Sequence, residues 1–532
     1  MNSRFAPRHV QVPIRVTVND LETGRERPMA LRKIIGMETE FGIFHRRAGD
    51  SNPIAASSLL INAYINSLDR SGTASPIPRV GWDFVDETPA NDARGLNIFA
   101  AMSSEVETHL VNAVLTNGAR YYVDHAHPEL STPECADPLT VVLYDRAAEM
   151  ILVESMRQAN AALPEGEEIV VYKNNSDRKG NSYGTHENYL MDRTTPFSRV
   201  VAQVMPHFVT RQIYTGAGKV GSEAVGISSQ QVPFQLTQRA DFFEEQVGLE
   251  TTLKRPIVNT RDEPHADAKK YRRLHVIVGD ANLSQVSTFL KVGPTALVLC
   301  MIEDGYLDRT FVLEDPVLAM RQVSYDLSLR RPLGLSDGGS ITALDMQWEY
   351  LGWARGYAEE RGLECIGGEA VGSAVLQRWE EVLTKLETDP MQLADQLDWV
   401  AKYRLINGYR ERHDLRWSDA RMAAMDLQYH DLRPTKSLFS RLGVETLVKD
   451  ADALIAVSEP PEDTRAYFRG KCLQKWADDI VAANWDSMVF DIGDDPLRRV
   501  PMMEPTRGTK AHVGSLLAEC ETSSELLRRL GS

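Results

Sequence analysis

The stretch LRKIIGMETEFGIFH, residues 31–45, shows the alternation of apolar and polar side chains that is typical of a β-strand. Ile35 and Met37 fall on one face, whereas Glu38 and Glu40 fall on the other. Because side chains two apart point to the same side of a strand, the two carboxylates should lie about 6–7 Å apart. We therefore predict a strand over 31–45 with one apolar and one acidic face.

A second predicted strand covers residues 119–125 and places Arg120, Tyr122 and Asp124 on one face. Polar groups on such a face are costly to bury unless the face lines a cavity. The alternative is a solvated sheet face with cross-strand ion pairs. The following residues, HAHPE (125–129), add further polar groups and favour a cavity. Carboxylates, a phenol and an arginine that converge in one hollow suit Mg²⁺ with a polyphosphate.

Two more predicted strands add secondary candidates. Residues 185–191 place His186 and Asn188 on one face, and residues 270–280 place Arg273 and His275 on one face. A lone histidine in a strand is more often structural than functional, so these residues rank below the first two sets.

The rest of the chain contains both helical and extended patterns. We predict helices over 53–68, 139–162, 197–212, 295–304 and 343–360, the last with Thr342 as N-cap, and short strands over 169–172 and 487–491. A polar stretch, 69–105, is too long for an ordinary connection. The prolines at 434, 460 and 461 indicate a boundary near 433. The expected organisation is a tail over 1–30, a catalytic domain over 31–432 with 69–105 as an inserted loop, and a small domain over 433–532.

The composition excludes several classes of function. The chain has 532 residues, 43% of them hydrophobic and 25% charged, with 59 basic and 75 acidic residues and a net charge of −16. This charge argues against binding to nucleic acid or to an anionic membrane surface. Apolar runs fall far below the ~20 residues of a membrane span. Five scattered cysteines without a CxxC motif are typical of a reducing compartment, so we expect a cytoplasmic protein.

A basic cluster is unusual in such an acidic chain. Its members lie within fifteen residues and are Lys402, Arg404, Arg410, Arg412 and Arg416. The cluster is either a solvated helix face or a docking groove for an acidic partner.

Several blocks of the sequence resemble one family, that of the Pup–protein ligase and its sister, the Pup deamidase/depupylase, within the glutamine synthetase-like carboxylate–amine ligases. The blocks are GMETEFG (36–42), TNGARYYVDHAHPE (116–129), YKNNSDRKGNSYGTHENYLM (172–191), TRQIYTGAGKVG (210–221), KYRRLHVIVGDANLSQVSTFLK (270–291) and TALDMQ (342–347). HAHPE and the long stretch around GWDFVDETPANDARG (81–95) resemble the deamidase/depupylase branch. The ligase is the alternative.

The resemblance implies an α+β fold with a curved antiparallel β-sheet cradle backed by helices, followed by a small C-terminal domain. It also implies ATP, or ADP with phosphate, together with Mg²⁺ in the cradle. Carried over by position, the magnesium ligands would be Glu38, Tyr122 and Glu129, and the nucleotide contacts Arg120, Thr132, Arg273 and Trp485. Asp124 matches the catalytic aspartate, and Glu40 and His275 are secondary candidates.

The activity implied by the resemblance is hydrolysis at a γ-carboxamide. The enzyme would convert the C-terminal glutamine of Pup to glutamate and would cleave the isopeptide bond between Pup and a substrate lysine. Asp124 would act as the nucleophile or as a general base for water, and the residues leave both roles open. The implied partners are Pup, a small, disordered and acidic protein, and pupylated proteins. The resemblance implies a monomer, and we expect the inserted loop to lie at the mouth of the cradle.

Overall fold

The computed structural model describes residues 29–49, 52–70, 80–85, 87–95, 111–494 and 496–531. Most of the predicted tail and much of the predicted inserted loop lie outside these ranges. One ten-stranded sheet forms the centre of the described molecule. In spatial order its strands are β13 (Tyr271–Val276), β8 (Thr185–Asp192), β1 (Ile35–Glu40), β6 (His127–Ser131), β5 (Arg120–Asp124), β4 (Asn112–Val114), β3 (Gly81–Trp82), β16 (Ile480–Ala483), β17 (Ser487–Phe490) and β18 (Arg498–Pro501).

The sheet has one apolar and one polar face. Neighbouring strands are antiparallel, except that β3 and β16 are parallel. In β1 the residues alternate between buried and half-buried, with Ile35 and Met37 buried, as the sequence predicts. Helices α1 and α2 pack behind β5, β6 and β1, and α5 packs behind β8. This arrangement confirms the predicted α+β cradle and leaves the polar face of the strands open for a site.

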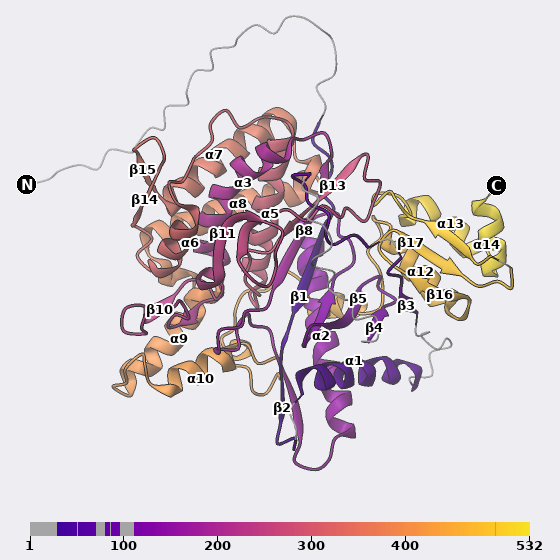
Figure 1. Cartoon of the computed structure of the whole chain (residues 1–532), viewed down its shortest axis with the longest axis horizontal. Coiled ribbons are helices and arrows are strands. Elements are labelled where there is room, and N and C mark those ends of the chain that lie inside the picture. The colour runs from indigo at the N-terminus through magenta and orange to yellow at the C-terminus, as the bar shows by residue number, and fades with distance from the viewer. Residues whose placement is uncertain are drawn as a thin grey trace, which may run out of the picture.

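The helices form two groups around the sheet. They are α1 (Pro53–Arg70), α2 (Pro138–Ala162), α3 (Phe197–Thr210), α4 (Gln212–Thr215), α5 (Gln285–Glu303), α6 (Pro316–Tyr325), α7 (Ala343–Arg361), α8 (Glu369–Thr388), α9 (Asp398–Arg412), α10 (Ala420–Tyr429), α11 (Asp450–Ala456), α12 (Ala466–Lys475), α13 (Lys510–Glu519) and α14 (Ser523–Leu530). Figure 1 shows α3, α6, α7 and α8 on one side of β1 and β8, and the yellow C-terminal elements on the other.

Thr342 is the N-cap of α7, as predicted, and its side chain accepts a hydrogen bond from the Asp345 amide.

Four two-stranded sheets complete the description. They pair β2 (Gly42–Arg46) with β7 (Glu168–Tyr172), β9 (Lys219–Val220) with β10 (Phe234–Gln235), β11 (Phe243–Gly248) with β12 (Arg255–Asn259), and β14 (Pro332–Gly334) with β15 (Ser340–Thr342). The prediction of one strand over 31–45 is therefore wrong. The chain leaves the large sheet at Phe41, and β2 pairs with β7 instead.

Helix α5 begins ten residues before its predicted start. Ser284 caps it by accepting a hydrogen bond from the Ser287 amide, and Pro294 lies inside the helix. Among the described residues α5 is the helix that is long and apolar enough to cross a membrane, but 94% of that window is buried inside the protein. A buried core helix has the same composition, so α5 is explained by its place behind the sheet.

The C-terminal region contains three strands, β16, β17 and β18, where the sequence predicts one. They extend the large sheet because β16 pairs with β3. Trp82 of β3 packs in the same apolar cluster as Phe468, Trp476 and Phe490. The strands beyond residue 433 belong to the same sheet as the strands before it. The domain boundary near 433 remains a prediction.

Candidate active site

Strand register brings the predicted polar residues onto one face of the sheet. Glu40 of β1 lies opposite Glu129 of β6, and Glu129 lies opposite Tyr122 of β5. Glu38 lies opposite His186 of β8. Directly opposed residues in antiparallel strands point to the same side. The sequence places each residue on a face, and the register places the faces side by side.

Three carboxylates gather in one part of this face. Glu40, Asp124 and Glu129 each offer an oxygen, and these oxygens lie within 4.8 Å of one another. Burial, followed by the negative charges of Asp124, Glu40 and Glu38, raises the pKa of Glu129 well above its ordinary value. Crowded carboxylates of this kind repel one another unless a cation lies among them, and hard oxygen ligands suit Mg²⁺.

A second group lies beside the first and combines Glu38 with two histidines. The ligand atoms of Glu38, His186 and His275 also lie within 4.8 Å of one another. Asn188 donates a hydrogen bond to Glu38 at 2.8 Å, and Arg273 lies 3.6 Å from the same carboxylate. Burial would raise the pKa of Glu38, but the hydrogen bond to His186 and the positive charge of Arg273 outweigh it and hold the pKa well below its ordinary value. Glu38 is therefore an anion at neutral pH.

His275 presents a buried nitrogen to this second group. Burial, then the charge of Arg273, lowers the pKa of His275 well below 6.5, so the ring is neutral. Its Nδ1 donates to Asn188 Oδ1 at 2.9 Å, because that oxygen can only accept. The buried Nε2 then has a lone pair and no hydrogen-bond partner among the described residues. Such an orphaned acceptor beside a carboxylate suits a bound cation.

Asp124 differs from its neighbours in exposure. About 35% of its side chain is exposed, and its Oδ2 lies 2.8 Å from His125 Nδ1. Burial would raise the pKa of Asp124, but the hydrogen bond from His125 and the charges around it lower the pKa overall. Asp124 is thus an ionised carboxylate that opens into the cavity, as a nucleophile or a general base requires.

A cavity lies in front of these residues on the polar face of the sheet. Its volume is about 420 Å³. Its lining includes Glu38, Glu40, Tyr122, Asp124, His127, Glu129, residues 180–184, His186, Arg239, Arg255, Arg261 and His275. Burial, followed by the charge of Glu129, raises the pKa of Tyr122 well above 10, so its phenol is neutral.

A second, more apolar pocket shares Glu38 with this cavity. It is also lined by Thr132, Arg273 and Trp485, three of the predicted nucleotide contacts, and by the apolar side chains of Ile35, Met37 and Leu190. An apolar slot with a tryptophan and an arginine, opening beside an acidic cavity, suits a nucleotide whose phosphates reach the carboxylates.

Arg120, the fourth predicted nucleotide contact, lines neither pocket. Its guanidinium lies between the rings of Trp82 and Tyr122, 4.0 and 3.9 Å from their centroids. It donates to Asn112 at 3.0 Å and lies 3.9 Å from Glu87. Arg120 thus connects the described part of the predicted insertion to the polar face of the sheet.

The structure also groups the predicted metal ligands differently from the sequence. Glu38 lies with the two histidines, whereas Glu40, a secondary candidate, lies with Asp124 and Glu129. The assignment of Glu38, Tyr122 and Glu129 as the magnesium set stays a prediction.

Arg239, Arg255 and Arg261 line the cavity but are not among the residues singled out from the sequence. Arg239 and Arg261 lie outside the strands, and Arg255 begins a short one, β12. No periodic pattern in the sequence indicates their position.

The predicted basic cluster is only partly a surface feature. Lys402 is buried and donates to Asp426 at 2.8 Å and to the Gly218 carbonyl at 2.7 Å. Its inclusion in a docking groove is therefore wrong. Arg404, Arg412 and Arg416 are exposed.

Comparison with known proteins places this geometry in a family. The profile of the Pup-ligase protein family matches residues 33–489. The chain is 52% identical to the "Depupylase" of Acidothermus cellulolyticus, over 94% of this chain and 99% of the relative. It is 46% identical to the "Pup deamidase/depupylase" of Mycolicibacterium smegmatis, over 94% and 100% of the two chains. It is 40% identical to the "Pup--protein ligase" of a Nocardioides species, over 76% and 90%.

Solved structures agree with the sequence matches. The ligase PafA, in its complex with the prokaryotic ubiquitin-like protein Pup, matches with a TM-score of 0.76 at 29% identity over 94% of each chain. The Pup ligase PafA in complex with ADP matches with a TM-score of 0.69 at 34% identity, over 76% of this chain and 89% of that one. The chain therefore belongs to the Pup-ligase protein family.

Proposed function

We propose that this chain is an ATP- and magnesium-dependent hydrolase that acts on Pup. It would convert the C-terminal glutamine of Pup to glutamate and would cleave the isopeptide bond between Pup and a lysine. The observation that carries this proposal is the ionised, cavity-facing Asp124 beside the carboxylates of Glu40 and Glu129. The relatives named as depupylases, which match over 94% of the chain, support the same conclusion.

The residues present suit both cofactors. The two clusters, Glu40–Asp124–Glu129 and Glu38–His186–His275, offer oxygen and nitrogen donors, including the orphaned Nε2 of His275. Thr132, Arg273 and Trp485 would hold the nucleotide in the adjacent pocket. When bound, magnesium would supply the positive charge that stabilises the developing oxyanion, and the nucleotide would supply phosphate oxygens.

The chain's own groups can perform the bond cleavage by two routes. In the first, an Asp124 oxygen attacks the γ-carbonyl carbon, the carbon–nitrogen bond breaks, and the amine leaves with a proton taken from a water molecule. The resulting anhydride between Asp124 and the γ-carboxyl group is hydrolysed by water, which restores Asp124. In the second, Asp124 takes a proton from water while the water oxygen attacks the γ-carbonyl carbon. The carbon–nitrogen bond then breaks, and Asp124 returns the proton to the leaving amine. Both routes need the ionised carboxylate that His125 stabilises.

Both substrates present the same reacting group. The side chain of glutamine and the isopeptide link to lysine are both γ-carboxamides of the last Pup residue. They differ only in the leaving amine, ammonia or lysine. One cavity with one carboxylate therefore serves both reactions.

The competing function is ligation of Pup to lysine. The relative named as a Pup–protein ligase and the solved ligase structures favour it. A ligase would consume ATP in proportion to the conjugate formed, whereas hydrolysis of an amide needs no such consumption.

The deciding experiment incubates the purified chain with magnesium and ATP, and either Pup ending in glutamine or a Pup–lysine conjugate. We expect mass spectrometry to show deamidated Pup and released target protein, and no activity when EDTA removes the metal. New conjugate formed from Pup-glutamate, with matching ATP consumption, would contradict the proposal and favour the ligase. A monomeric state and a cytoplasmic location remain predictions.

A further inference from the structure

His127 lies beside Asp124 on the polar face of the sheet. The two residues are directly opposed in the hairpin of β5 and β6, where His125 and Ala126 form the turn. Directly opposed residues point to the same side, with Cβ atoms about 4.5–5.5 Å apart. Both side chains line the active cavity, and the His127 ring is half-buried there. The hairpin therefore holds an imidazole next to the carboxylate that is proposed to react.

A hydrogen bond to Phe41 determines which ring nitrogen of His127 carries the proton. Nδ1 lies 3.1 Å from the Phe41 carbonyl oxygen, and a carbonyl oxygen can only accept, so Nδ1 is the donor. Nε2 of the neutral ring then has a lone pair, and it makes no hydrogen bond to any described residue. His127 thus offers the cavity one acceptor nitrogen.

The turn of the chain at Phe41 keeps this ring in place. The Phe41 amide donates to the Pro128 carbonyl at 3.0 Å, so the acceptor of His127 Nδ1 is itself bonded to the strand that bears His127. The ring also stacks on Tyr183, with centroids 4.2 Å apart. A Cβ at Gly42 would lie 2.6 Å from Tyr183 Oη, so only glycine leaves room for the phenol. The imidazole is therefore held at one edge and over one face.

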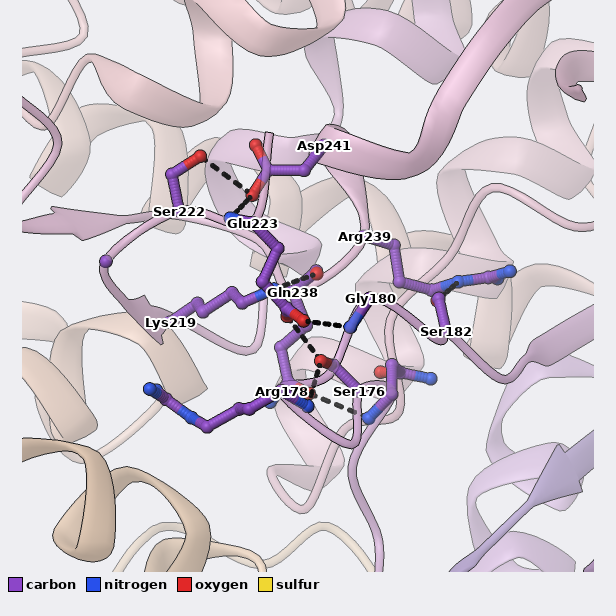
Figure 2. A network of polar contacts seen from close by, with 12 residues as sticks. Ser176, Arg178, Gly180, Ser182, Lys219, Ser222, Glu223, Gln238, Arg239 and Asp241 are labelled. Atoms are coloured by element: carbon purple, nitrogen blue, oxygen red, sulfur yellow. Dashed lines mark hydrogen bonds and ion pairs between the residues drawn. The ribbon is translucent and has the colours of Figure 1, made fainter. Parts of the chain in front are cut away.

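Tyr183 is fixed in turn by the loop that precedes it (Figure 2). Glu223 accepts hydrogen bonds from Ser176 Oγ and from the Gly180 amide. At the end of this loop Tyr183 Oη donates to Asn174 Oδ1 at 2.6 Å. The loop and the stacked rings are thus ordered before any substrate arrives, which lowers the ordering cost of binding.

We infer that His127 Nε2 accepts a hydrogen bond from the nitrogen of the scissile γ-carboxamide. The inference rests on the proposed function and adds to it a contact with the leaving group. The nitrogen has hydrogens to donate in both substrates, two in the glutamine side chain and one in the isopeptide link. The contact would fix the plane of the carboxamide, so that the carbonyl carbon faces Asp124.

The dimensions of the hairpin suit this contact. A carboxylate that is ready to attack lies about 3–3.5 Å from the carbonyl carbon. The carbon–nitrogen bond adds about 1.3 Å, and a hydrogen bond from the nitrogen to Nε2 spans about 2.9–3.0 Å. One carboxamide can therefore bridge two side chains whose Cβ atoms lie about 4.5–5.5 Å apart. The nearby carboxylates of Glu40 and Glu129 suit a cation, whereas a neutral nitrogen suits an N–H group.

The test compares Pup ending in glutamine with Pup ending in glutamate γ-methyl ester, whose leaving oxygen has no hydrogen to donate. His127→Phe keeps a ring to stack on Tyr183 and removes the acceptor. With magnesium and ATP present, we expect it to lower kcat/KM for the amide about tenfold and to leave the ester within about twofold of wild type. His127→Gln, which can place an oxygen near the position of Nε2, should recover most of the amide activity. His512→Phe, at an exposed site outside both pockets, is the matched control.

A second measurement observes the hydrogen bond itself. Pup with an NMR-active nitrogen isotope in the side chain of its C-terminal glutamine is bound to the Asp124→Asn chain, which should not consume it. We expect one of the side-chain amide protons to move downfield on binding, as hydrogen-bonded protons do. The shift should be lost when His127→Phe is added to the same chain.

Several outcomes would overturn the contact. An equal loss on amide and ester would do so, because the ring would then act through folding or packing. So would an unchanged amide rate in His127→Phe, a downfield shift that persists without His127, or an ester that the wild-type chain cannot hydrolyse, since the missing bond accounts for only about tenfold. In each case ammonia release by the wild-type chain leaves the proposed hydrolase intact. Absence of that release would instead overturn the proposed function.

Discussion

Asp124 and Glu129 share one cavity but have opposite electrostatic environments. Hydrogen bonding to His125 and nearby cations lower the pKa of Asp124, despite its burial, whereas burial and like charges raise the pKa of Glu129. Carboxylates whose pKa values are driven apart usually have different roles. Asp124 therefore suits the reacting role, and Glu129 suits a role as ligand to a cation.

Replacing Asp124 with Asn tests the reacting role. The amide is isosteric but neither attacks a carbonyl nor accepts a proton, so we expect ammonia release to fall by about 10³-fold or more. Thermal unfolding and nucleotide affinity should remain near wild type. Activity within a few-fold of wild type would remove Asp124 from the reaction, and Asp337→Asn, in an exposed turn, serves as a control for the loss of a carboxylate.

At the level of elements, local sequence predicts strands better than it predicts their partners. The alternation in 31–45 predicts the two faces of β1, and Thr342 marks the start of α7. The division of that stretch at Phe41 depends on β7, which lies more than a hundred residues away. The start of α5 at Gln285 is not predicted from the sequence because Pro294 lies inside the helix, and a proline usually marks a helix boundary.

The described part of the predicted insertion packs against the segment that precedes β13. Thr260 donates from Oγ1 to Asp92 at 3.0 Å, and the Ala93 amide donates to the Thr260 carbonyl at 2.8 Å. The next residue, Arg261, lines the active cavity. This contact gives the insertion a physical route to the site.

Weakening the contact between Asp92 and Thr260 should change the reaction rate. We expect Asp92→Ala to alter kcat several-fold, while Pup affinity, measured by titration, stays within twofold, because the contact acts on Arg261 rather than on a Pup surface. Arg94→Ala is the control, since it removes the Arg94–Asp92 pair and keeps the bond to Thr260. Equal effects of the two variants would argue against this route.

The exposed arginines of α9 and the turn after it remain a candidate surface for acidic Pup. We expect Arg404→Glu combined with Arg412→Glu to weaken Pup binding about tenfold at low salt, and less at high salt, where screening reduces the attraction. Arg330→Glu with Arg331→Glu makes the same charge change elsewhere on the exposed surface. A similar affinity for both double variants would exclude this surface.

For the whole molecule, the site depends on contacts that no local pattern contains. Trp485 and Arg465 enter the pocket proposed for the nucleotide from the C-terminal region, whereas Glu38 comes from the first strand. The family resemblance indicated Trp485, but Arg239, Arg255 and Arg261 had no signal of their own. Side-chain types and strand faces could be read from the sequence, and the convergence of distant segments could not.

Glu134 joins the two regions through a buried ion-pair network. It accepts from Arg465 at 2.7 Å and pairs with Arg469 of α12. Burial would raise the pKa of Glu134, but the charges of Arg469 and Arg465 outweigh it and lower the pKa to about 2. The resulting stabilisation is complete above the unfolded-state pKa of about 4.3 and is lost as the pH falls from there towards 2.

Glu134→Gln should therefore destabilise the protein by about 3 kcal/mol at neutral pH, because it leaves two buried guanidinium groups underpaired. Denaturant unfolding at several pH values should show the difference from wild type shrinking below about pH 4. Glu462→Gln breaks an exposed pair with Lys510 and should cost less than about 1 kcal/mol. A pH-independent difference for Glu134→Gln would contradict the ion-pair explanation.

The contribution of Trp485 and Arg465 to the nucleotide pocket has a consequence for biosynthesis. A ribosome that has translated the strands bearing Glu38 and Asp124 has not yet made Trp485, the far wall of the pocket. The nascent polypeptide therefore has the reacting carboxylate long before it has a complete nucleotide pocket. We therefore expect activity only from a chain translated nearly to its end, since an interrupted product would lack Trp485.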